Sequence, residues 1–378
     1  MSDVIDLAKA LIACPSVTPR TVGVFNVLED YLRPLGFVAH RMIFKEEGFE
    51  PVENIYLRLG TQSPNFCFAG HTDVVPPGDE AAWDVPPFEP QVVDGELIGR
   101  GAEDMKGAIA AFMVAVKQFL EAKGAPKGSI SFLITQDEEG DAVNGTRKVL
   151  GWLKEQGEVI DHCIVGEPTN PDFLGEMVKI GRRGSISFQL AVRGKQGHAA
   201  YPDRADNPVT RMIHMLHALK STPLDEGTEH FQPSNLEITS VDVGNPTTNI
   251  IPALATARFN VRFNDRHSAA SIHQWVEERC APFGAFELKA HITGEAFLNK
   301  DEYFEQLLVR AIREVTGSAP KLSTTGGTSD ARFIKDICPV IEFGTTGRTA
   351  HHVNERVEVK TLEGLVNIYH RVLDGYFS

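Results

Sequence analysis

Residues 65–73 read NFCFAGHTD: an apolar run ends in glycine and is followed directly by a histidine and an aspartate. The arrangement recurs at 129–135, an apolar run shortly before Glu138, and at 163–166, directly before Glu167. Short apolar runs with such boundaries are typical of buried strands. In open α/β sheets, functional side chains gather at the carboxyl ends of strands. The three runs therefore predict an α/β fold with a site at this edge of its sheet.

Five residues along the chain have side chains of the types that bind zinc: His71, Asp104, Glu139, Glu167 and His351. Zinc takes imidazole nitrogen and carboxylate oxygen in small coordination numbers, and a hydrolytic site keeps one position for water. We expect His71 to bind one ion and His351 another, with Asp104 bridging them and one glutamate completing each shell. The charges of two zinc ions are then balanced by three carboxylates and a bridging hydroxide. Glu138 remains free to act as the base.

Each of these residues also has a purely structural interpretation. A single histidine is more often a core or surface group than a ligand, so position alone does not assign His71 or His351. Asp104 could simply be a helix N-cap, a position that aspartate favours. The residues after it predict a helix with one buried stripe, at Ile109, Phe112, Met113, Val116, Phe119 and Leu120. The recurrence of ligand-type side chains after strands favours the metal interpretation.

Strand-like and helical segments alternate up to about residue 178. Near Lys179 the pattern of apolar residues changes to that of half-exposed strands. The next part predicts three strands and two helices, at 185–192, 235–243 and 255–263 and at 207–220 and 268–280. An antiparallel sheet with two helices on one face is the economical arrangement. We therefore expect a catalytic domain at 1–178 and 293–378 and an inserted α+β domain at 179–292. The chain must return to the first domain because His351 has to meet His71.

Composition excludes several classes of function. The 378 residues are 42% hydrophobic and 23% charged, as in ordinary globular proteins. A net charge of −14 argues against a nucleic-acid surface, which needs a concentrated basic field. The longest apolar run, 107–116, is too short to cross a bilayer. We expect neither nucleic acid nor membrane as a partner, whereas a small anionic substrate remains compatible with a locally positive metal site.

Cysteine usage and the amino terminus predict a cytoplasmic protein. The five cysteines are odd in number and lack paired spacing, which fits a reducing compartment. Cys67 and Cys163 lie in apolar runs and are expected to be core residues. The first residues are acidic, and no basic region precedes an apolar stretch, so we expect no secretion signal.

Four motifs carry a resemblance that extends over nearly the whole chain: GHTDVVP (70–76), GRGAEDMKG (99–107), TQDEEG (135–140) and GEPT (166–169). They resemble the aminoacylase and carboxypeptidase-type family of two-zinc metallohydrolases. The resemblance implies a mixed-sheet, zinc-peptidase-like catalytic domain with two Zn²⁺ per subunit, Co²⁺ being possible at one or both positions. It also implies that Asp73 orients His71 without binding metal, and that a cis peptide follows Asp104.

Five further motifs resemble a narrower group within the family: GRRGS (181–185), GKQGHAAYPD (194–203), NIIP (249–252), GGTSD (326–330) and HHVNE (351–355). This group hydrolyses N-succinyl-LL-2,6-diaminopimelate to succinate and LL-2,6-diaminopimelate, in the biosynthesis of lysine and cell-wall precursors. The likeness implies that Glu138 takes a proton from the attacking water and passes it to the departing amine. It also implies that the inserted domain is a lid that forms a homodimer.

The same likeness implies roles for residues of the inserted domain and the GGTSD motif. His198 would reach the partner's active site and stabilise the oxyanion of the tetrahedral intermediate; by position alone it could equally be a loop histidine facing solvent. The positions expected to contact the substrate are Arg182, Ser185, Tyr201, Asn249, Arg262, Gly327 and Thr328. Arg182 and Thr328 would hold the succinyl carboxylate, because arginine suits bidentate capture. Arg182 and Arg262 could instead form surface salt bridges.

One position departs from the pattern of this group. Gly347 stands where an asparagine usually lies four residues before the metal histidine, so one donor to succinate is lost, and Arg348 is a candidate to replace it. The departure leaves room for a related acyl group, as in acetylornithine deacetylases or aminoacylases. A more distant alternative is a noncatalytic binding module on the same fold.

Overall fold

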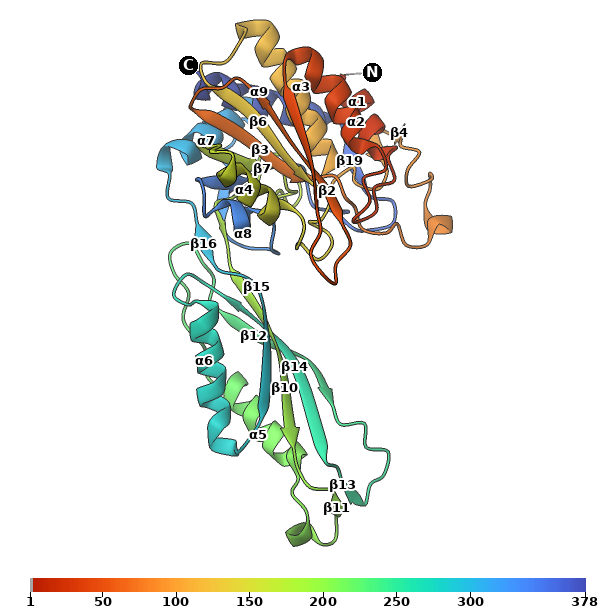
Figure 1. The fold of residues 1–378 in the computed structure, drawn as a ribbon, viewed down its shortest axis with the longest axis vertical. Helices are drawn as coiled ribbons and strands as arrows, with labels where there is room; N and C mark the ends of the chain where they lie inside the picture. The colour runs from red at the N-terminus through yellow and green to blue at the C-terminus, as the bar shows by residue number, and fades with distance from the viewer. Residues whose placement is uncertain (1–2) are drawn as a thin grey trace. The chain divides into compact units, whose positions relative to one another are not determined.

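The computed structural model describes residues 3–378, which form two compact units (Figure 1). The first unit holds the chain up to Ile180, together with Asn299–Ser323 and Ser329–Ser378. The second unit holds Gly181–Leu298 and the short segment Thr324–Thr328. The sequence placed the boundaries at 178/179 and 292/293, so the observed changes lie a few residues later.

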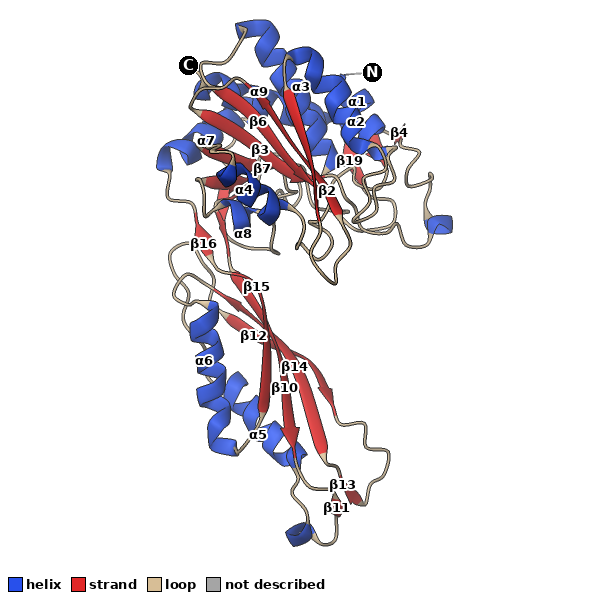
Figure 2. Cartoon of the chain, viewed as in Figure 1, coloured by secondary structure: helices blue, strands red, loops and turns tan. Residues whose placement is uncertain are grey.

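An eight-stranded mixed sheet forms the centre of the first unit (Figure 2). Its order is β1 (Val38–Phe44), β2 (Val52–Leu59), β6 (Ser129–Thr135), β3 (Asn65–His71), β7 (His162–Val165), β18 (Val340–Glu342), β8 (Met177–Lys179) and β17 (Lys321–Ser323). β3 pairs in parallel with β6 on one side and β7 on the other. Every residue of β3 and β6 is buried, as expected for strands covered on both faces. The α/β class with a mixed sheet is thus confirmed.

Helices cover both faces of this sheet (Figure 1). The helices of the first unit are α1 (Asp3–Ile12), α2 (Val24–Leu32), α3 (Lys106–Lys123), α4 (Thr146–Glu155), α7 (Glu302–Thr316), α8 (Ala331–Ile334) and α9 (Val359–Tyr376). α3 and α9 pack together on one face, and α4 and α8 lie on the other. Phe112 of α3 stacks on Phe68 of β3, with ring centroids 4.5 Å apart. The predicted single stripe on α3 is wrong, because this helix is buried on all sides from Lys106 to Val116.

A small three-stranded sheet brings two distant loops of the first unit together. It consists of β4 (Gln91–Val93), β5 (Glu96–Ile98) and β19 (Arg356–Glu358). In the pairing of β19 with β5, Arg356 lies opposite Ile98. The loop that contains Asp104 follows β5, and the loop that contains His351 precedes β19. The pairing therefore places these two loops side by side.

The second unit is built on a four-stranded antiparallel sheet with two helices packed against it (Figure 1). Its strand order is β12 (Asn235–Asp242), β14 (Leu254–Phe263), β10 (Gly184–Arg193) and β15 (Glu287–Gly294), and its helices are α5 (Pro208–Lys220) and α6 (Ala269–Cys280). Ile186, Phe188, Leu190 and Val192 alternate along β10 and are buried in the core under the helices. The predicted strands and helices of this region are confirmed to within about two residues, a usual margin for element ends.

β15 is the longest strand of the second unit that the sequence did not predict. It is an edge strand with mostly exposed side chains, among them Ile292 at 55% exposure, so it lacks the apolar pattern of a buried strand. Beyond it, β16 (Phe297–Leu298) pairs with β9 (Gly181–Arg182). These two features keep the chain in the second unit up to Leu298. A further pair, β11 (Gly197–His198) and β13 (Ile250–Ile251), lies at the opposite end of this unit (Figure 1).

Other features of the chain are local. Short 3-10 turns lie at Arg33–Leu35, Glu80–Ala82, Pro202–Arg204 and Ala281–Phe283. All five cysteines are free, and Cys67 and Cys163 are fully buried as predicted. Within residues 3–378, no helix is both long enough and apolar enough to cross a membrane.

Candidate metal centre

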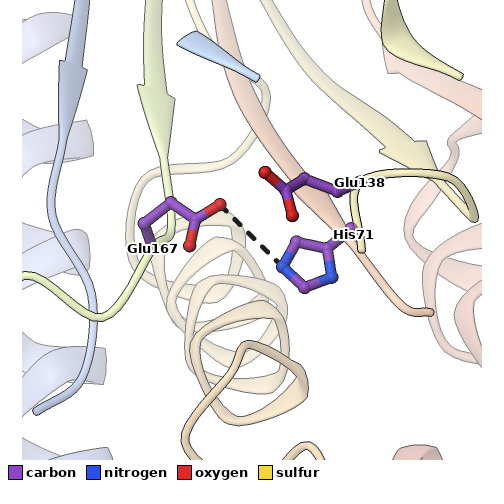
Figure 3. Close-up of side chains that lie close together, drawn as sticks. All are labelled: His71, Glu138 and Glu167. Atoms are coloured by element: carbon purple, nitrogen blue, oxygen red, sulfur yellow. Dashed lines mark ion pairs between the residues drawn. The ribbon is translucent and has the colours of Figure 1, made fainter. Parts of the chain in front are cut away.

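Three adjacent parallel strands deliver side chains to one edge of the central sheet. His71 is the last residue of β3, Glu138 and Glu139 follow the end of β6, and Glu167 follows the end of β7. Because β6, β3 and β7 are parallel neighbours, their carboxyl ends meet at the same edge. In Figure 3 the carboxylates of Glu138 and Glu167 point toward the His71 ring. These residues share a site because the strands that precede them are neighbours.

Asp104 lies between two histidines that are distant in the sequence. Its Oδ1 is 3.2 Å from Nε2 of His71, and its Oδ2 is 3.3 Å from Nε2 of His351. Nε2 of His351 is also 2.7 Å from Oε1 of Glu139, and Nε2 of His71 is 3.8 Å from Oε1 of Glu167. The five side chains therefore form two halves, His71 with Glu167 and His351 with Glu139. Asp104 offers one oxygen to each half.

Two sets of three potential ligand atoms lie within 4.8 Å of one another: His71, Glu138 and Glu167, and His71, Asp104 and Glu139. Glu138 is therefore as close to the cluster as the predicted ligands are. The peptide bond between Asp104 and Met105 is cis, as the family resemblance implied.

Asp73 contacts His71 through its main chain. Nδ1 of His71 lies 2.9 Å from the carbonyl oxygen of Asp73, so this nitrogen carries the proton and Nε2 faces the cluster. The carboxylate of Asp73, whose Oδ1 is 3.7 Å from the same nitrogen, accepts hydrogen bonds from the backbone N–H groups of Glu138, at 3.4 Å, and Glu139, at 3.1 Å. Asp73 thus ties the histidine to the loop that carries the two glutamates.

The electrostatics of the cluster fit a site for cations. Burial and neighbouring carboxylates raise the pKa of Glu138 to about 8, although His71 opposes the shift. Burial and the nearby charges of Asp104 and Glu138 raise the pKa of Glu167 well above its usual range. Oε1 of Glu167 is buried and, among the described residues, has no hydrogen-bond partner. Buried carboxylates with an unsatisfied oxygen and two imidazoles are the donor set that a zinc pair requires, and cations would remove their mutual repulsion.

The other predicted site residues all belong to the second unit and form two groups. Nη1 of Arg182 donates to the carbonyl oxygens of Thr325 and Gly327, at 3.3 and 3.1 Å. Ser185 and Arg262 are cross-strand partners on β10 and β14. The hydroxyl of Thr328 is buried and lacks a hydrogen-bond partner among the described residues.

The second group consists of His198, Tyr201 and Asn249, which are all exposed. The rings of His198 and Tyr201 lie 5.6 Å apart, and the carbonyl of Asn249 accepts a hydrogen bond from the backbone N–H of Ala199. This group follows the end of β10, whereas Arg182 precedes its start. Since β10 has ten residues, the two groups are separated by about 30 Å.

Comparison with known proteins places the chain in a family. The sequence profile described as peptidase family M20/M25/M40 matches residues 67–375. The chain belongs to this M20 family. Relatives named succinyl-diaminopimelate desuccinylase are 55% identical in Rhodospirillum centenum, over all of this chain and 98% of the relative, and 52% identical in Bradyrhizobium sp. strain BTAi1, over all of both chains.

Solved structures of the M20 family share the fold. A metallo-carboxypeptidase from Sulfolobus solfataricus has a TM-score of 0.78 at 16% identity, with 100% of this chain and 99% of that chain covered. A dinuclear metal-binding peptidase from Bacillus subtilis has a TM-score of 0.71 at 16% identity, with 99% and 97% covered. The chain is thus an M20 hydrolase whose fold family includes dinuclear metal enzymes.

Three buried acids near the candidate metal centre were not predicted from the sequence to have a role there: Glu103, Asp330 and Glu355. Asp330 accepts a hydrogen bond from the Thr146 hydroxyl, and its charge contributes to the raised pKa of Glu138. All three lie inside motifs that the sequence does display. Nothing in the letters of a motif, however, distinguishes an acid that binds metal from one that holds a loop.

Proposed function

We propose that this chain hydrolyses N-succinyl-LL-2,6-diaminopimelate to succinate and LL-2,6-diaminopimelate, as a two-metal enzyme of lysine and cell-wall precursor biosynthesis. The observation that carries the chemistry is the position of Asp104, with one carboxylate oxygen close to each of His71 and His351. The substrate is inferred from the full-length relatives at 51–55% identity, which are named succinyl-diaminopimelate desuccinylase.

His71, Asp104 and Glu167 would hold one ion, and His351, Asp104 and Glu139 the other. Zinc suits this set of nitrogen and oxygen donors, and cobalt is an alternative at one or both positions. When bound, such a metal pair makes a water nucleophilic near neutral pH and polarises the amide carbonyl.

Glu138 is the proposed base and acid of the reaction. Its carboxylate lies beside the predicted ligands without being needed to complete either half of the cluster. A nearby cation favours its ionised form, which can accept the proton of the attacking water. The same carboxyl group then gives this proton to the nitrogen of the departing amine.

The succinyl carboxylate is assigned to Arg182 and Thr328. The Arg182 side chain is buried, so its charge acts in a poorly solvated environment. The Thr328 hydroxyl, which has no hydrogen-bond partner in residues 3–378, can donate a hydrogen bond. Ser185, Arg262 and Gly327 are proposed to surround the remainder of the substrate.

The separation within the second unit supports a homodimer. A single small substrate cannot contact Arg182 and His198 of the same chain, because about 30 Å lie between their groups. We therefore assign His198, with the exposed Tyr201 and Asn249, to the substrate of a second copy, through a dimer formed by residues 179–292. There the imidazole would donate to the developing oxyanion. Five free cysteines support a reducing cytoplasm as the location.

The acyl group is tested by comparing N-succinyl- and N-acetyl-LL-2,6-diaminopimelate in the zinc-loaded protein. A charge-assisted contact to the succinyl carboxylate should give a kcat/KM on the order of 10²-fold higher for the succinyl compound. Arg182→Gln should remove most of this preference while changing acetyl hydrolysis little. Equal rates for both compounds, or a preference for acetyl, would instead favour a deacetylase and would implicate Gly347.

A further inference from the structure

Glu103 is a buried acid directly before Asp104 whose side chain binds the loop that leads to His351. Its side chain is 1% exposed. Oε1 accepts from the Thr346 hydroxyl at 2.5 Å and the Arg348 N–H at 3.1 Å, and Oε2 accepts from the N–H and hydroxyl of Thr349, at 2.6 and 2.8 Å. An ionised carboxylate offers about four acceptor positions. All of those of Glu103 are used by this one loop.

Glu355 is a buried acid shortly after His351 that makes the converse connection. Its oxygens accept from the backbone N–H groups of Gly101, Glu103 and Asp104, at 3.0, 2.9 and 3.0 Å. The fourth donor is the guanidinium of Arg100, at 2.7 Å. All four acceptor positions of the Glu355 carboxylate are therefore occupied by donors of the loop that carries Asp104.

We propose that Glu103 and Glu355 are positioning residues that form a reciprocal clamp between the Asp104 loop and the His351 loop. Each acid belongs to one loop and binds the other. The clamp fixes the distance between the carboxylate of Asp104 and the imidazole of His351. This inference rests on the proposed metal centre. It assigns the clamp to the half that contains His351 and Glu139.

The two histidines differ in how much else holds them. His71 is 1% exposed and ends the buried strand β3, so the sheet fixes its position. The side chain of His351 is 49% exposed, and its backbone has a positive φ of 65°. Its carbonyl accepts a long bond of 3.4 Å from Nη2 of Arg100. The position of His351 therefore depends on its loop, whereas that of His71 does not.

The test is metal titration of Glu103→Gln and Glu355→Gln, followed by calorimetry with Zn²⁺ and by the absorption spectrum of Co²⁺. Glutamine keeps the shape of the side chain but replaces one carboxylate oxygen, which accepts hydrogen bonds, with an NH₂ group, which donates them. That group would face two donors of the opposite loop. Mutation of residues that orient the metal ligands typically lowers metal affinity by about 10–100-fold. We expect the ion held by His351 and Glu139 to bind more weakly by that factor, with a changed Co²⁺ spectrum. The ion held by His71 and Glu167 should be affected less, through Asp104 alone.

Two further variants separate the clamp from general destabilisation. Glu29→Gln removes a buried glutamate on α2 that pairs with Arg33 and Arg41, away from both loops, and should leave both affinities unchanged. Thr346→Val removes a single hydroxyl donor to Glu103 and should weaken the ion held by His351 several-fold. This variant serves if the glutamine variants fail to fold.

The outcomes distinguish this inference from the proposed function. A wild-type chain that binds fewer than two ions would overturn both. A wild-type chain that binds two ions, with clamp variants that bind both as tightly or lose both equally, would overturn the clamp alone.

Discussion

Glu138 is a carboxylate whose surroundings suit proton transfer. Burial and nearby acids raise its pKa to about 8, although His71 opposes the shift. Positive charge beside it lowers the pKa toward the range in which it can both accept and release a proton. Neither half of the proposed metal site needs Glu138 as a ligand, which is why we propose it as the base.

Glu138→Gln should lower kcat by at least about 10³-fold, because the amide cannot accept the proton of the attacking water. Both metal ions should remain bound, since the predicted ligands are unchanged. Succinate release and metal content, measured on the same sample, check this expectation. Asp141→Asn, an exposed acid of the same loop, is the matched control and should be fully active. Substantial turnover by the glutamine variant would remove Glu138 from the base role.

The convergence of His71, Glu138 and Glu167 could be predicted from the sequence because each follows a buried strand, and parallel strands deliver their ends to one edge. The reciprocal bonds of Glu103 and Glu355 could not. They depend on the approach of loops about 250 residues apart, which local pattern does not encode. The contact of His71 with the backbone carbonyl of Asp73 could not be predicted either, because every residue has a carbonyl oxygen and the sequence does not show which one the ring meets.

Elements with a strong apolar period were predicted well, and those without one were missed. α5 and α6 carry helical spacing and a core-facing side, so their bounds were found. β15 is an exposed edge strand without that signal. α3 was recognised as a helix, but its burial on all sides depends on α1 and α9 packing against it, which its own residues do not reveal.

The loop between α5 and β12 depends on one acid, Asp225, whose side chain is 4% exposed. Asp225 accepts bonds from the N–H of Gly227 at 2.7 Å, the side-chain amide of Asn264 at 2.5 Å and Nε2 of His267 at 3.0 Å. Burial opposes ionisation, but these bonds and those from Ser234 lower the pKa of Asp225 to about 2. Because the folded pKa is below the unfolded value of about 3.9, the stabilisation is complete above that pH and is lost as the pH falls through about 2.

Asp225→Asn should therefore lower the free energy of unfolding at neutral pH, by about 1 kcal/mol because solvent screens part of the interaction. The difference from the wild type should shrink as the pH falls from about 4 toward 2, where the wild-type carboxylate also becomes protonated. Urea unfolding of both proteins at neutral pH and at several acidic values measures it. A difference that stays constant over this range would show that the charge of Asp225 does not stabilise the loop.

At the level of the whole molecule, the proposed dimer explains why the second unit carries two separate groups of candidate substrate residues. The sequence indicated both groups through their motifs, GRRGS and GKQGHAAYPD, but not the distance between them. That distance follows from the length of β10 and requires the fold.

Mixing two inactive variants tests whether His198 acts across the dimer. In a mixed dimer of Glu138→Gln and His198→Ala, one site combines an intact Glu138 with an intact partner His198. Random exchange of subunits should restore about a quarter of the wild-type sites in a two-fold dimer. If His198 acts within its own chain, mixing should restore no activity. If His198 plays no part, His198→Ala should be active before mixing.

The proposed mechanism depends on paired cations that would activate water beside Glu138. The most direct measurement is succinate release from N-succinyl-LL-2,6-diaminopimelate by the chelated protein as zinc is added in known equivalents. We predict that activity is absent after chelation, rises as zinc is added and is complete at about two equivalents per chain. Undiminished turnover in the fully chelated protein, or no succinate release with both ions bound, would contradict it.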